Sequence, residues 1–386
     1  MAKRKQAVVV GALGVIGRYI VERLLKESDW SVVGLSRRSA AAPPSGAKRR
    51  EGPARPLEGA RAGRSLRSPA RDPTPRYRHV SVDLLDREDT AARLAELTGV
   101  THVFYAAFQA ATGAAAGYAS NIAPNRDMLV NAVTAIDAAA SALRRVVLVT
   151  GTKYYGSHLG AFKTPARETD PRHTGPNYYF DQIDWLTAFQ RGKGWDWVEL
   201  RPQTLCGFAP GTPMSLAPAI AVYAAISKEL KRPLRFPGKP GAERSIYQVT
   251  ESTHFASAAY WAATEPRCGL EAFNITNGDY FRWQNLWPRL AEAFEMPAGD
   301  PQPLNLTAEM ADKAPLWRAM TEKFRLQPYP FDALVAWPFA DYVFGCDWDV
   351  MSDLTKSRRF GFHDVVDSEE MFVRLMRQFR AERIVP

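Results

Sequence analysis

A glycine-rich turn between a short apolar strand and an amphipathic helix constrains the fold of this chain more than any other feature. The turn reads GALGVIG over residues 11–17, directly after the apolar run at 6–10. In such a unit Gly11 permits the tight turn, Gly14 lets the backbone approach a pyrophosphate and Gly17 allows close helix packing. The N-terminus of the helix then stabilises phosphate charge. The turn therefore predicts a dinucleotide site in a βαβ unit.

Strands and helices alternate through the first part of the chain. Short apolar or β-branched runs predict strands at residues 6–10, 30–35, 79–82, 102–106, 146–150 and 195–200. Amphipathic or alanine-rich runs predict helices after the glycine turn and at 91–97 and 125–140. This alternation predicts an α/β fold with a doubly wound, parallel Rossmann sheet.

The pattern loosens after residue 201, where prolines and aromatic residues become more frequent. We therefore expect a smaller, mainly helical C-terminal lobe that binds substrate. The expected division is a Rossmann domain at 1–204 and a substrate-binding lobe at 205–386, some segments of which return to the Rossmann core. With 386 residues, 46% of them hydrophobic, the chain has enough apolar side chains for both cores.

The net charge of +9 is concentrated in one segment. Between residues 39 and 78 there are ten Lys and Arg residues and only three Asp and Glu residues. The same segment is rich in Ala, Pro, Gly and Ser and poor in aliphatic residues, which predicts a disordered basic insertion at 39–77. An arm that binds nucleic acid nonspecifically is the alternative. Since no aromatic residue precedes Tyr77 in this segment, we favour a solvated loop and expect no specific nucleic-acid partner.

Several classes of protein are disfavoured by the sequence. No apolar run approaches the roughly 18 residues that a membrane span needs, and the run at 214–226 contains Pro218, which is typical of a buried helix or pocket wall. Basic residues precede the first apolar run as in a signal peptide, but no small-residue cleavage site follows. Three widely spaced cysteines fit reduced thiols, and the histidines show no metal-ligand spacing with them. We expect a cytoplasmic protein with no metal site and no membrane partner.

The end of the second expected strand indicates which dinucleotide is bound. An NAD site favours an acidic residue here for the ribose 2′-hydroxyl, but this chain has Ser36-Arg37-Arg38. Two guanidinium groups suit a 2′-phosphate, although the arginines would also be explained as the start of the basic insertion. Asp83, after the third strand, is placed to contact the adenine ring. We therefore expect NADPH, held at this end by Gly11, Gly14, Val15, Ile16, Gly17, Ser36, Arg37, Arg38, Asp83 and Leu84.

The fifth expected strand leads into the sequence TGTKYYG at residues 150–156. Ordinary short-chain dehydrogenases place a Ser or Thr near this point and then a Tyr-x-x-x-Lys motif. This chain has no such motif, because Gln182 lies four residues after Tyr178 and Ile183 lies four residues after Tyr179. Either the site is inactive or its chemistry is arranged differently.

Several longer stretches point to one known family. They are GALGVIG, THVFYAAF, TGTKYYG, NYYFDQIDWL, RPQTLCGFAPGTPMSL, LRFPGKPGA, EAFNITNGDYFRWQNLWPRLAEAFEM and the terminal RIVP. In these stretches the chain resembles the progesterone 5β-reductase/iridoid synthase-like (PRISE) family of short-chain dehydrogenases/reductases. The resemblance covers nearly all of the chain except the insertion.

The resemblance implies an activity and a set of catalytic residues. The family reduces the carbon–carbon double bond of an enone or enal with NADPH, so we expect an oxidoreductase that acts on a small hydrophobic enone. Its catalytic lysine lies in the TGTK motif and its tyrosine two residues after an asparagine, which correspond to Lys153 and Tyr179. In this family a glycine, here Gly151, stands where ordinary short-chain dehydrogenases have a hydroxyl residue. Tyr179 would stabilise the enolate oxygen and Lys153 would hold the nicotinamide ribose, beside Thr150, Gly151, Pro202 and Thr204.

The resemblance also indicates pocket residues. Phe108 and Met214 correspond to pocket positions, and Phe339 or Phe344 is expected to close the pocket. Many plant relatives carry Trp where Phe108 stands, so the substrate itself is not carried over. From the residues alone, Tyr179 and its aromatic neighbours would equally be explained as part of the core.

Two other functions stay open at this point. One is carbonyl reduction, epimerisation or dehydration, as in other extended short-chain dehydrogenases, against which the missing Ser-Tyr-Lys arrangement argues. The other is an NADP-binding sensor without chemistry, against which the retained Lys153 and Tyr179 argue. A homodimer is the default expectation for enzymes of this type.

Overall fold

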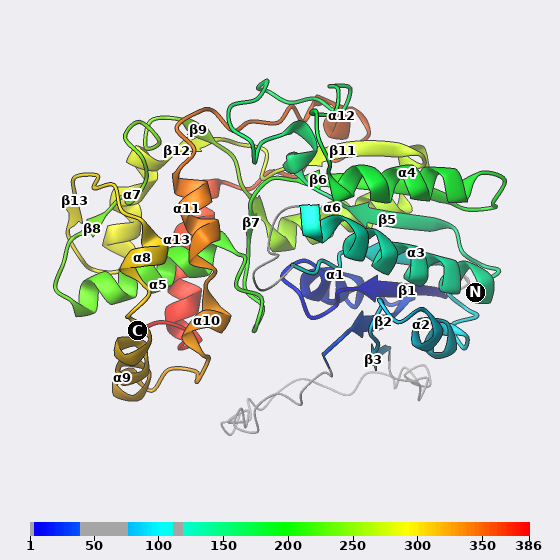
Figure 1. Ribbon diagram of the computed structural model, residues 1–386, viewed down its shortest axis with the longest axis horizontal. Coiled ribbons are helices and arrows are strands. Elements are labelled where there is room, and N and C mark those ends of the chain that lie inside the picture. The colour runs from blue at the N-terminus through cyan, green and yellow to red at the C-terminus, as the bar shows by residue number, and fades with distance from the viewer. Residues whose placement is uncertain (1–3, 39–75, 111–118) are drawn as a thin grey trace, which may run out of the picture.

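The structure is a computed structural model that describes residues 4–38, 76–110 and 119–386. Figure 1 shows two lobes side by side, one with the sheet and the N-terminus and the other mainly helical and with the C-terminus. Residues 39–75 of the expected insertion lie outside the described residues. The end of that range was wrong, because Tyr77 is already the first residue of the third strand.

Seven parallel strands form the sheet of the first lobe, in the order β11-β6-β5-β4-β1-β2-β3. Their bounds are β1 (Lys5–Val10), β2 (Trp30–Ser36), β3 (Tyr77–Ser81), β4 (His102–Tyr105), β5 (Arg145–Val149), β6 (Asp196–Pro202) and β11 (Glu271–Ile275). Central strands such as β1 and β5 are rich in valine because parallel strands are buried on both faces. The predicted α/β fold with a doubly wound sheet is confirmed. The strand β11 was not expected.

Helices cover both faces of this sheet (Figure 1). On one face, strand residues such as Val9 pack against α1 (Gly17–Leu24) and α6 (Ser252–Thr264). On the other face, alternate residues such as Val8 pack against α2 (Arg87–Leu94), α3 (Ile122–Ala139) and α4 (Tyr178–Gln190). The helix expected at 91–97 begins earlier, because Asp86 caps it by accepting a hydrogen bond from the backbone N–H of Asp89 at 2.9 Å.

The second lobe is built around α5 (Leu216–Glu229), in which every residue from Leu216 to Ser227 is buried. The helices α7 (Trp283–Ala293), α11 (Trp337–Phe344) and α13 (Ser368–Ala381) contribute to the same core. The run at 214–226 is thus largely a buried helix, as predicted. No helix among the described residues is long and apolar enough to cross a membrane.

Short elements complete the second half of the chain. They are β7 (Leu205–Cys206), β8 (Leu234–Arg235), β9 (Ile246–Tyr247), β10 (Thr250–Glu251), β12 (Phe281–Arg282), β13 (Ala298–Gly299), α8 (Leu306–Glu309), α9 (Ala314–Phe324), α10 (Phe331–Leu334) and α12 (Thr355–Arg359), with 3-10 turns at Ala119–Asn121, Thr152–Tyr155 and Pro266–Cys268. The strand β11 and the helix α6 come from this half and join the Rossmann sheet and its cover. The division at residue 204 stays a prediction.

Candidate functional site

The glycine turn forms a closely packed backbone cradle at the carboxyl end of β1. Gly11 has a φ of 83°, and a Cβ added there would lie 2.8 Å from the carbonyl oxygen of Ala106. A Cβ at Gly17 would overlap the carbonyl oxygen of Gly11. Glycine is therefore required at both positions. Ile16, which precedes α1, provides no side-chain cap, so the first turn of the helix keeps backbone N–H groups suited to an anion.

Two arginines flank this edge of the sheet after β2. Arg37 donates to the side-chain oxygen of Gln109 at 2.8 Å, and Arg38 donates to the carbonyl oxygen of Pro210 at 3.1 Å. Both acceptors are neutral and both arginines are exposed, so the guanidinium charges are not neutralised by these contacts. The site can therefore accept a further anionic group such as a phosphate.

Ser36 lies between the sheet and these arginines. Its hydroxyl donates to the carbonyl oxygen of Arg38 at 2.7 Å and lies 2.8 Å from Nε2 of His79 on β3. Burial lowers the pKa of His79, which favours the neutral ring. His79 was not among the expected site residues, because a single histidine in a strand gives no functional signal.

Asp83 and Leu84 follow β3 at the same edge. The exposed Asp83 side chain accepts a hydrogen bond from the backbone N–H of Leu85 at 3.1 Å, and Leu84 is buried in the core on the α3 side of the sheet. Asp83 therefore lies just beyond β3, the edge strand that pairs with β2, and its contact with an adenine ring stays a prediction.

A cavity of about 190 Å³ lies where the carboxyl ends of β5 and β6 meet the second lobe. Ten residues expected from the sequence line it, namely Ile16, Phe108, Thr150, Gly151, Lys153, Tyr179, Pro202, Thr204, Met214 and Phe339. Phe344 does not; it is buried in the second lobe, with its ring 5.6 Å from that of Phe236. Phe108 and Met214 are 43% and 38% exposed, which places apolar surface at the mouth of the cavity.

Tyr179 and Gly151 meet inside this cavity. A Cβ added to Gly151 would lie 3.2 Å from the hydroxyl oxygen of Tyr179 and 3.4 Å from the carbonyl oxygen of Pro202. A larger residue at position 151 would therefore crowd the phenol. Ordinary short-chain dehydrogenases have a serine or threonine near this position. Here Gly151 lets the Tyr179 hydroxyl lie directly against the segment that carries Lys153.

The protonation of these two side chains follows from their surroundings. Burial raises the pKa of Tyr179, although a side-chain hydrogen bond with Tyr178 acts in the opposite direction. The phenol therefore stays protonated near neutral pH and remains a hydrogen-bond donor. Burial lowers the pKa of Lys153, since a charged ammonium is less stable out of water.

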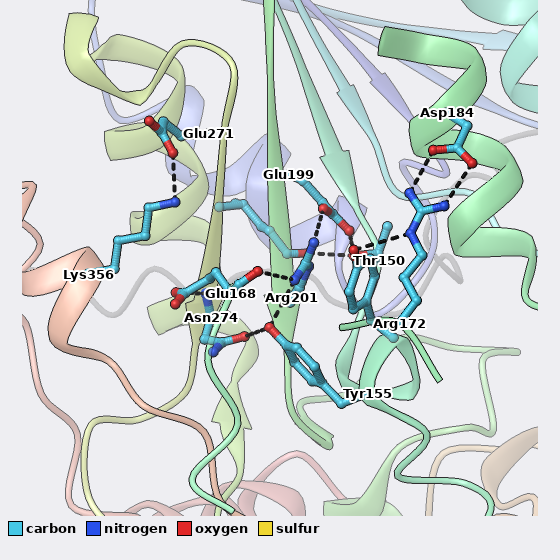
Figure 2. Close-up of polar contacts among 12 residues, drawn as sticks. Thr150, Tyr155, Glu168, Arg172, Asp184, Glu199, Arg201, Glu271, Asn274 and Lys356 are labelled. Carbon is cyan, nitrogen blue, oxygen red and sulfur yellow. Dashed lines mark hydrogen bonds and ion pairs between the residues drawn. The ribbon is translucent and has the colours of Figure 1, made fainter. Parts of the chain in front are cut away.

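A buried ion pair supports the segment that carries Lys153 (Figure 2). The side chains of Glu199 and Arg201 on β6 are 1% and 4% exposed, and their charged atoms lie 2.7 Å apart. Thr150 donates to the other carboxylate oxygen of Glu199 at 2.7 Å. Arg201 donates to the hydroxyl of Tyr155 at 3.0 Å. One ion pair therefore holds both ends of the segment 150–155 against the sheet.

Further contacts of the same network reach the edge strand. The Tyr155 hydroxyl donates to the side-chain oxygen of Asn274 on β11 at 2.7 Å, and the backbone N–H of Asn274 donates to Glu168 at 2.7 Å. Burial by itself lowers the pKa of Arg201, but the neighbouring Glu199 carboxylate raises it overall, so the guanidinium stays charged. These pairings were not expected, because no local pattern in the chain indicates them.

Some cavity residues were not expected from the sequence. Tyr342 lies about one helical turn after Phe339 on α11, so its spacing would have placed it on the same face. Its hydroxyl donates to the carbonyl oxygen of Ser157 at 3.1 Å. Gln203 donates to the Thr204 hydroxyl at 3.2 Å, and that hydroxyl also lies 2.9 Å from the hydroxyl of Tyr247.

Clusters of metal-ligating side chains are absent from the part of the chain that the structure describes. In the ranges 4–38, 76–110 and 119–386 there is no group of three or more His, Cys, Asp or Glu side chains placed to hold a metal ion. All three cysteines are buried and free.

Comparison with solved structures identifies the wider fold. The chain is similar to a UDP-glucose 4-epimerase from Thermotoga maritima, with a TM-score of 0.64 and 15% identity, covering 97% of this chain and 99% of that one. It is also similar to the UDP-glucose 4-epimerase of Thermus thermophilus in complex with NAD, with a TM-score of 0.60 and 19% identity, covering 97% and 99%. At these identities the likeness concerns the fold alone.

Comparison of sequences identifies the family. An (S)-8-oxocitronellyl enol synthase from Nepeta cataria is 32% identical over 98% of this chain and 93% of that protein. A 3-oxo-Δ(4,5)-steroid 5β-reductase from Arabidopsis thaliana is 30% identical over 98% and 93%. A short chain dehydrogenase from Penicillium aethiopicum is 31% identical over 99% of both chains. Residues 78–386 match the model of the PRISE-like Rossmann-fold domain, and the chain belongs to this family.

Proposed function

We propose that this protein reduces the carbon–carbon double bond of a small hydrophobic enone or enal with NADPH. The observation that carries the proposal is the position of the Tyr179 hydroxyl, close against Gly151 in the cavity that Lys153 also lines. The relatives named as a steroid 5β-reductase and as enol synthases support the same class of reaction.

The residues at the carboxyl edge of the sheet fit a dinucleotide with a 2′-phosphate. Glycine at 11 and 17 lets the turn pack closely on its own backbone, whereas a Cβ at Gly14 would meet only the carbonyl oxygen of Gly11 within 4 Å, so this side of the turn is open to a pyrophosphate at the start of α1. Arg37 and Arg38 would bind the 2′-phosphate, since their present partners are neutral oxygens. The adenine ring would lie beside Asp83, and Thr150, Pro202 and Thr204 would contact the nicotinamide end.

The chemistry requires little from the protein beyond position and charge. NADPH, when bound, would supply a hydride to the β-carbon of the enone; the electron pair of the C=C bond would form the double bond of the enolate, and the π pair of the carbonyl would move to its oxygen. Tyr179 donates a hydrogen bond to that oxygen and stabilises the enolate as it forms. Lys153 would hold the ribose hydroxyls of the cofactor, and its ammonium group, when protonated, would favour donation by Tyr179. Solvent then protonates the α-carbon, so a third hydroxyl residue is not required.

The cavity walls favour an uncharged substrate. Phe108, Met214 and Phe339 present apolar surface around the Tyr179 hydroxyl. The hydroxyls of Thr150 and Thr204 already have partners within the protein. A carboxylate or phosphate on the substrate would therefore lose its hydration without a fixed partner, apart from Lys153.

The direct test is oxidation of NADPH in the presence of 2-cyclohexen-1-one or progesterone, with NADH in parallel and with product identification. We expect a saturated ketone and a preference for NADPH. An allylic alcohol as the product would instead indicate carbonyl reduction. Tight NADPH binding without turnover of any enone tested would favour a sensor.

The assignment of the 2′-phosphate site gives a separate prediction. Arg37→Ala should weaken NADPH binding by about 10–100-fold, because a hydrogen bond to a charged group contributes about 1.5–3 kcal/mol. NADH binding should change by less than about threefold. Titration of each dinucleotide by fluorescence measures both, with Arg318→Ala on the exposed face of α9 as the charge-matched control. Equal weakening of NADPH and NADH would contradict the assignment.

A further inference from the structure

Asn177 stands at the start of α4, two residues before Tyr179, and is 1% exposed. Its backbone is extended, with φ −151° and ψ 122°, and its side-chain oxygen accepts a hydrogen bond from the backbone N–H of Tyr179 at 3.0 Å. This is the geometry of a helix N-cap. The asparagine therefore fixes where the first turn of α4, and with it Tyr179, begins.

The other end of the same amide contacts the segment that carries Lys153. The Asn177 amide nitrogen donates to the carbonyl oxygen of Lys153 at 2.9 Å and lies 3.1 Å from Nε2 of His173. The orientation of the amide is fixed by its partners, because rotating it by half a turn would set oxygen against oxygen at Lys153 and N–H against N–H at Tyr179. One buried side chain thus connects the backbones of both candidate catalytic residues.

Side-chain contacts set the relative position of these segments: the Asn177 amide, and the ring of Phe180 on α4, whose centroid lies 5.1 Å from that of Tyr154. Lys153 and Asn177 are 24 residues apart, and the described stretch 156–177 between the 3-10 turn and α4 contains no helix or strand except an isolated bridge at Ala166. The Lys153 segment is anchored to β6 and β11 through Tyr155, whereas α4 is held to the sheet by Ile183 and Leu186. Since α4 also contacts β6, both segments rest on the same strand, and the Asn177 amide links them next to the cavity.

A second bridge joins the same two segments near the surface. Arg172 donates to the hydroxyl of Tyr154 at 3.3 Å and forms a two-pronged contact with Asp184 of α4 at 2.6 and 2.8 Å (Figure 2). The side chains of Arg172 and Asp184 are 37% and 61% exposed, so this ion pair contributes little free energy to holding the two segments together. The buried Asn177 amide acts closer to both Lys153 and Tyr179.

We propose that Asn177 is a positioning residue that sets the separation of Lys153 and Tyr179, and through it the rate of hydride transfer. The inference rests on the proposed reduction of an enone. A displacement of about 1 Å at a reacting centre lowers rates by about 100-fold, and a single amide that bonds to both segments limits such a displacement. Asn177 itself contacts neither substrate nor cofactor in this scheme.

Two substitutions separate positioning from helix capping. Asn177→Ser retains a good N-cap but is too short to reach Lys153 as well. Asn177→Asp retains the shape and the cap but places an acceptor opposite the Lys153 carbonyl oxygen. Both variants should fold. The measured quantity is the rate constant for NADPH oxidation in a single turnover with excess 2-cyclohexen-1-one, because an unfolded fraction lowers its amplitude but not its rate constant.

We expect both variants to lower this rate constant by about 10–100-fold with NADPH affinity within about threefold of wild type. With NADPH deuterated at C4, the same rate constant should show the full primary kinetic isotope effect of hydride transfer. Asp184→Asn, which breaks the surface bridge, and Asn305→Ser, which changes the N-cap of α8 outside the cavity lining, should leave the rate constant within about twofold. A normal rate constant with reduced amplitude in the Asn177 variants would overturn the proposal.

A crystal structure of Asn177→Ser tests the same inference without any substrate. The Lys153 carbonyl should move from the start of α4 by more than about 0.5 Å, the tolerance of a preorganised site. An unchanged position would overturn the inference even if the wild-type protein reduces enones. If the wild-type protein reduces no enone while Lys153 does move, the positional inference holds and the proposed reaction fails.

Discussion

Tyr179→Phe should lower kcat for enone reduction by about 100–1,000-fold while NADPH binds with nearly its original affinity. The magnitude is that of removing one donor from an oxyanion site, because the substitution deletes the hydrogen bond to the oxygen on which negative charge develops. The ring remains, so its packing against Tyr178, at a centroid distance of 4.4 Å, is preserved.

The measurement is steady-state kinetics with NADPH and 2-cyclohexen-1-one, together with a fluorescence titration of NADPH. Tyr178→Phe is the matched variant, since it removes a hydroxyl from the adjacent tyrosine in the same cavity. It should lower kcat by less than about tenfold, because a hydrogen bond to Tyr179 contributes only about 0.5–1.5 kcal/mol. Equal losses in the two variants, or joint loss of NADPH binding and activity, would indicate that Tyr179 has a structural role.

Glu199→Ala should lower the free energy of unfolding by about 3–5 kcal/mol, the second large effect expected. The substitution leaves Arg201 charged and buried without its carboxylate partner, and it removes the acceptor of the Thr150 hydroxyl. Arg201→Met should be destabilising for the corresponding reason. The double variant Glu199→Leu/Arg201→Met should cost less than the sum of the single changes, because no unpaired charge is left in the interior.

Urea denaturation of the single and double variants measures the coupling between the two residues. Glu22→Gln is the control, because it breaks an ion pair with Arg18 whose side chains are 46% (Arg18) and 51% (Glu22) exposed. This substitution should lower the free energy of unfolding by less than about 1 kcal/mol. Additive effects of the Glu199 and Arg201 changes would contradict the view that the pair stabilises the segment as one unit.

Local patterns in the sequence predicted most of the Rossmann lobe. The first six strands were expected within a few residues of their observed bounds, because short apolar runs that contain valine are visible without knowledge of their partners. The strand β11 (EAFNI) was missed because it lies beyond residue 201, where the alternation of strands and helices loosens. This strand belongs to the second half of the chain. It pairs with β6 because β6 would otherwise be the unpaired edge of the sheet.

The candidate site was likewise predicted only in part from local patterns in the sequence. Lys153 and Tyr179 were identified by resemblance to a family and not by their spacing, because the usual Tyr-x-x-x-Lys motif is absent. Phe339 and Phe344 were alternatives in the sequence, and only Phe339 lines the cavity. Neither the spacing nor the hydrophobicity of α11 distinguishes them, since both residues are apolar and the direction that each faces depends on the packing of the helix.

The sequence by itself determined the glycine turn, the parallel sheet, the arginines after β2 and the buried helix at the centre of the second lobe. Each of these depends on residues that are close together in the chain, through periodicity, β-branching or the steric freedom of glycine. Only the tertiary structure decided that Tyr179 lies against Gly151, that Glu199 and Arg201 support Thr150 and Tyr155, and that Asn177 joins α4 to Lys153. These contacts connect segments that are up to about 50 residues apart, and the stacking of strands and helices determines which of them meet.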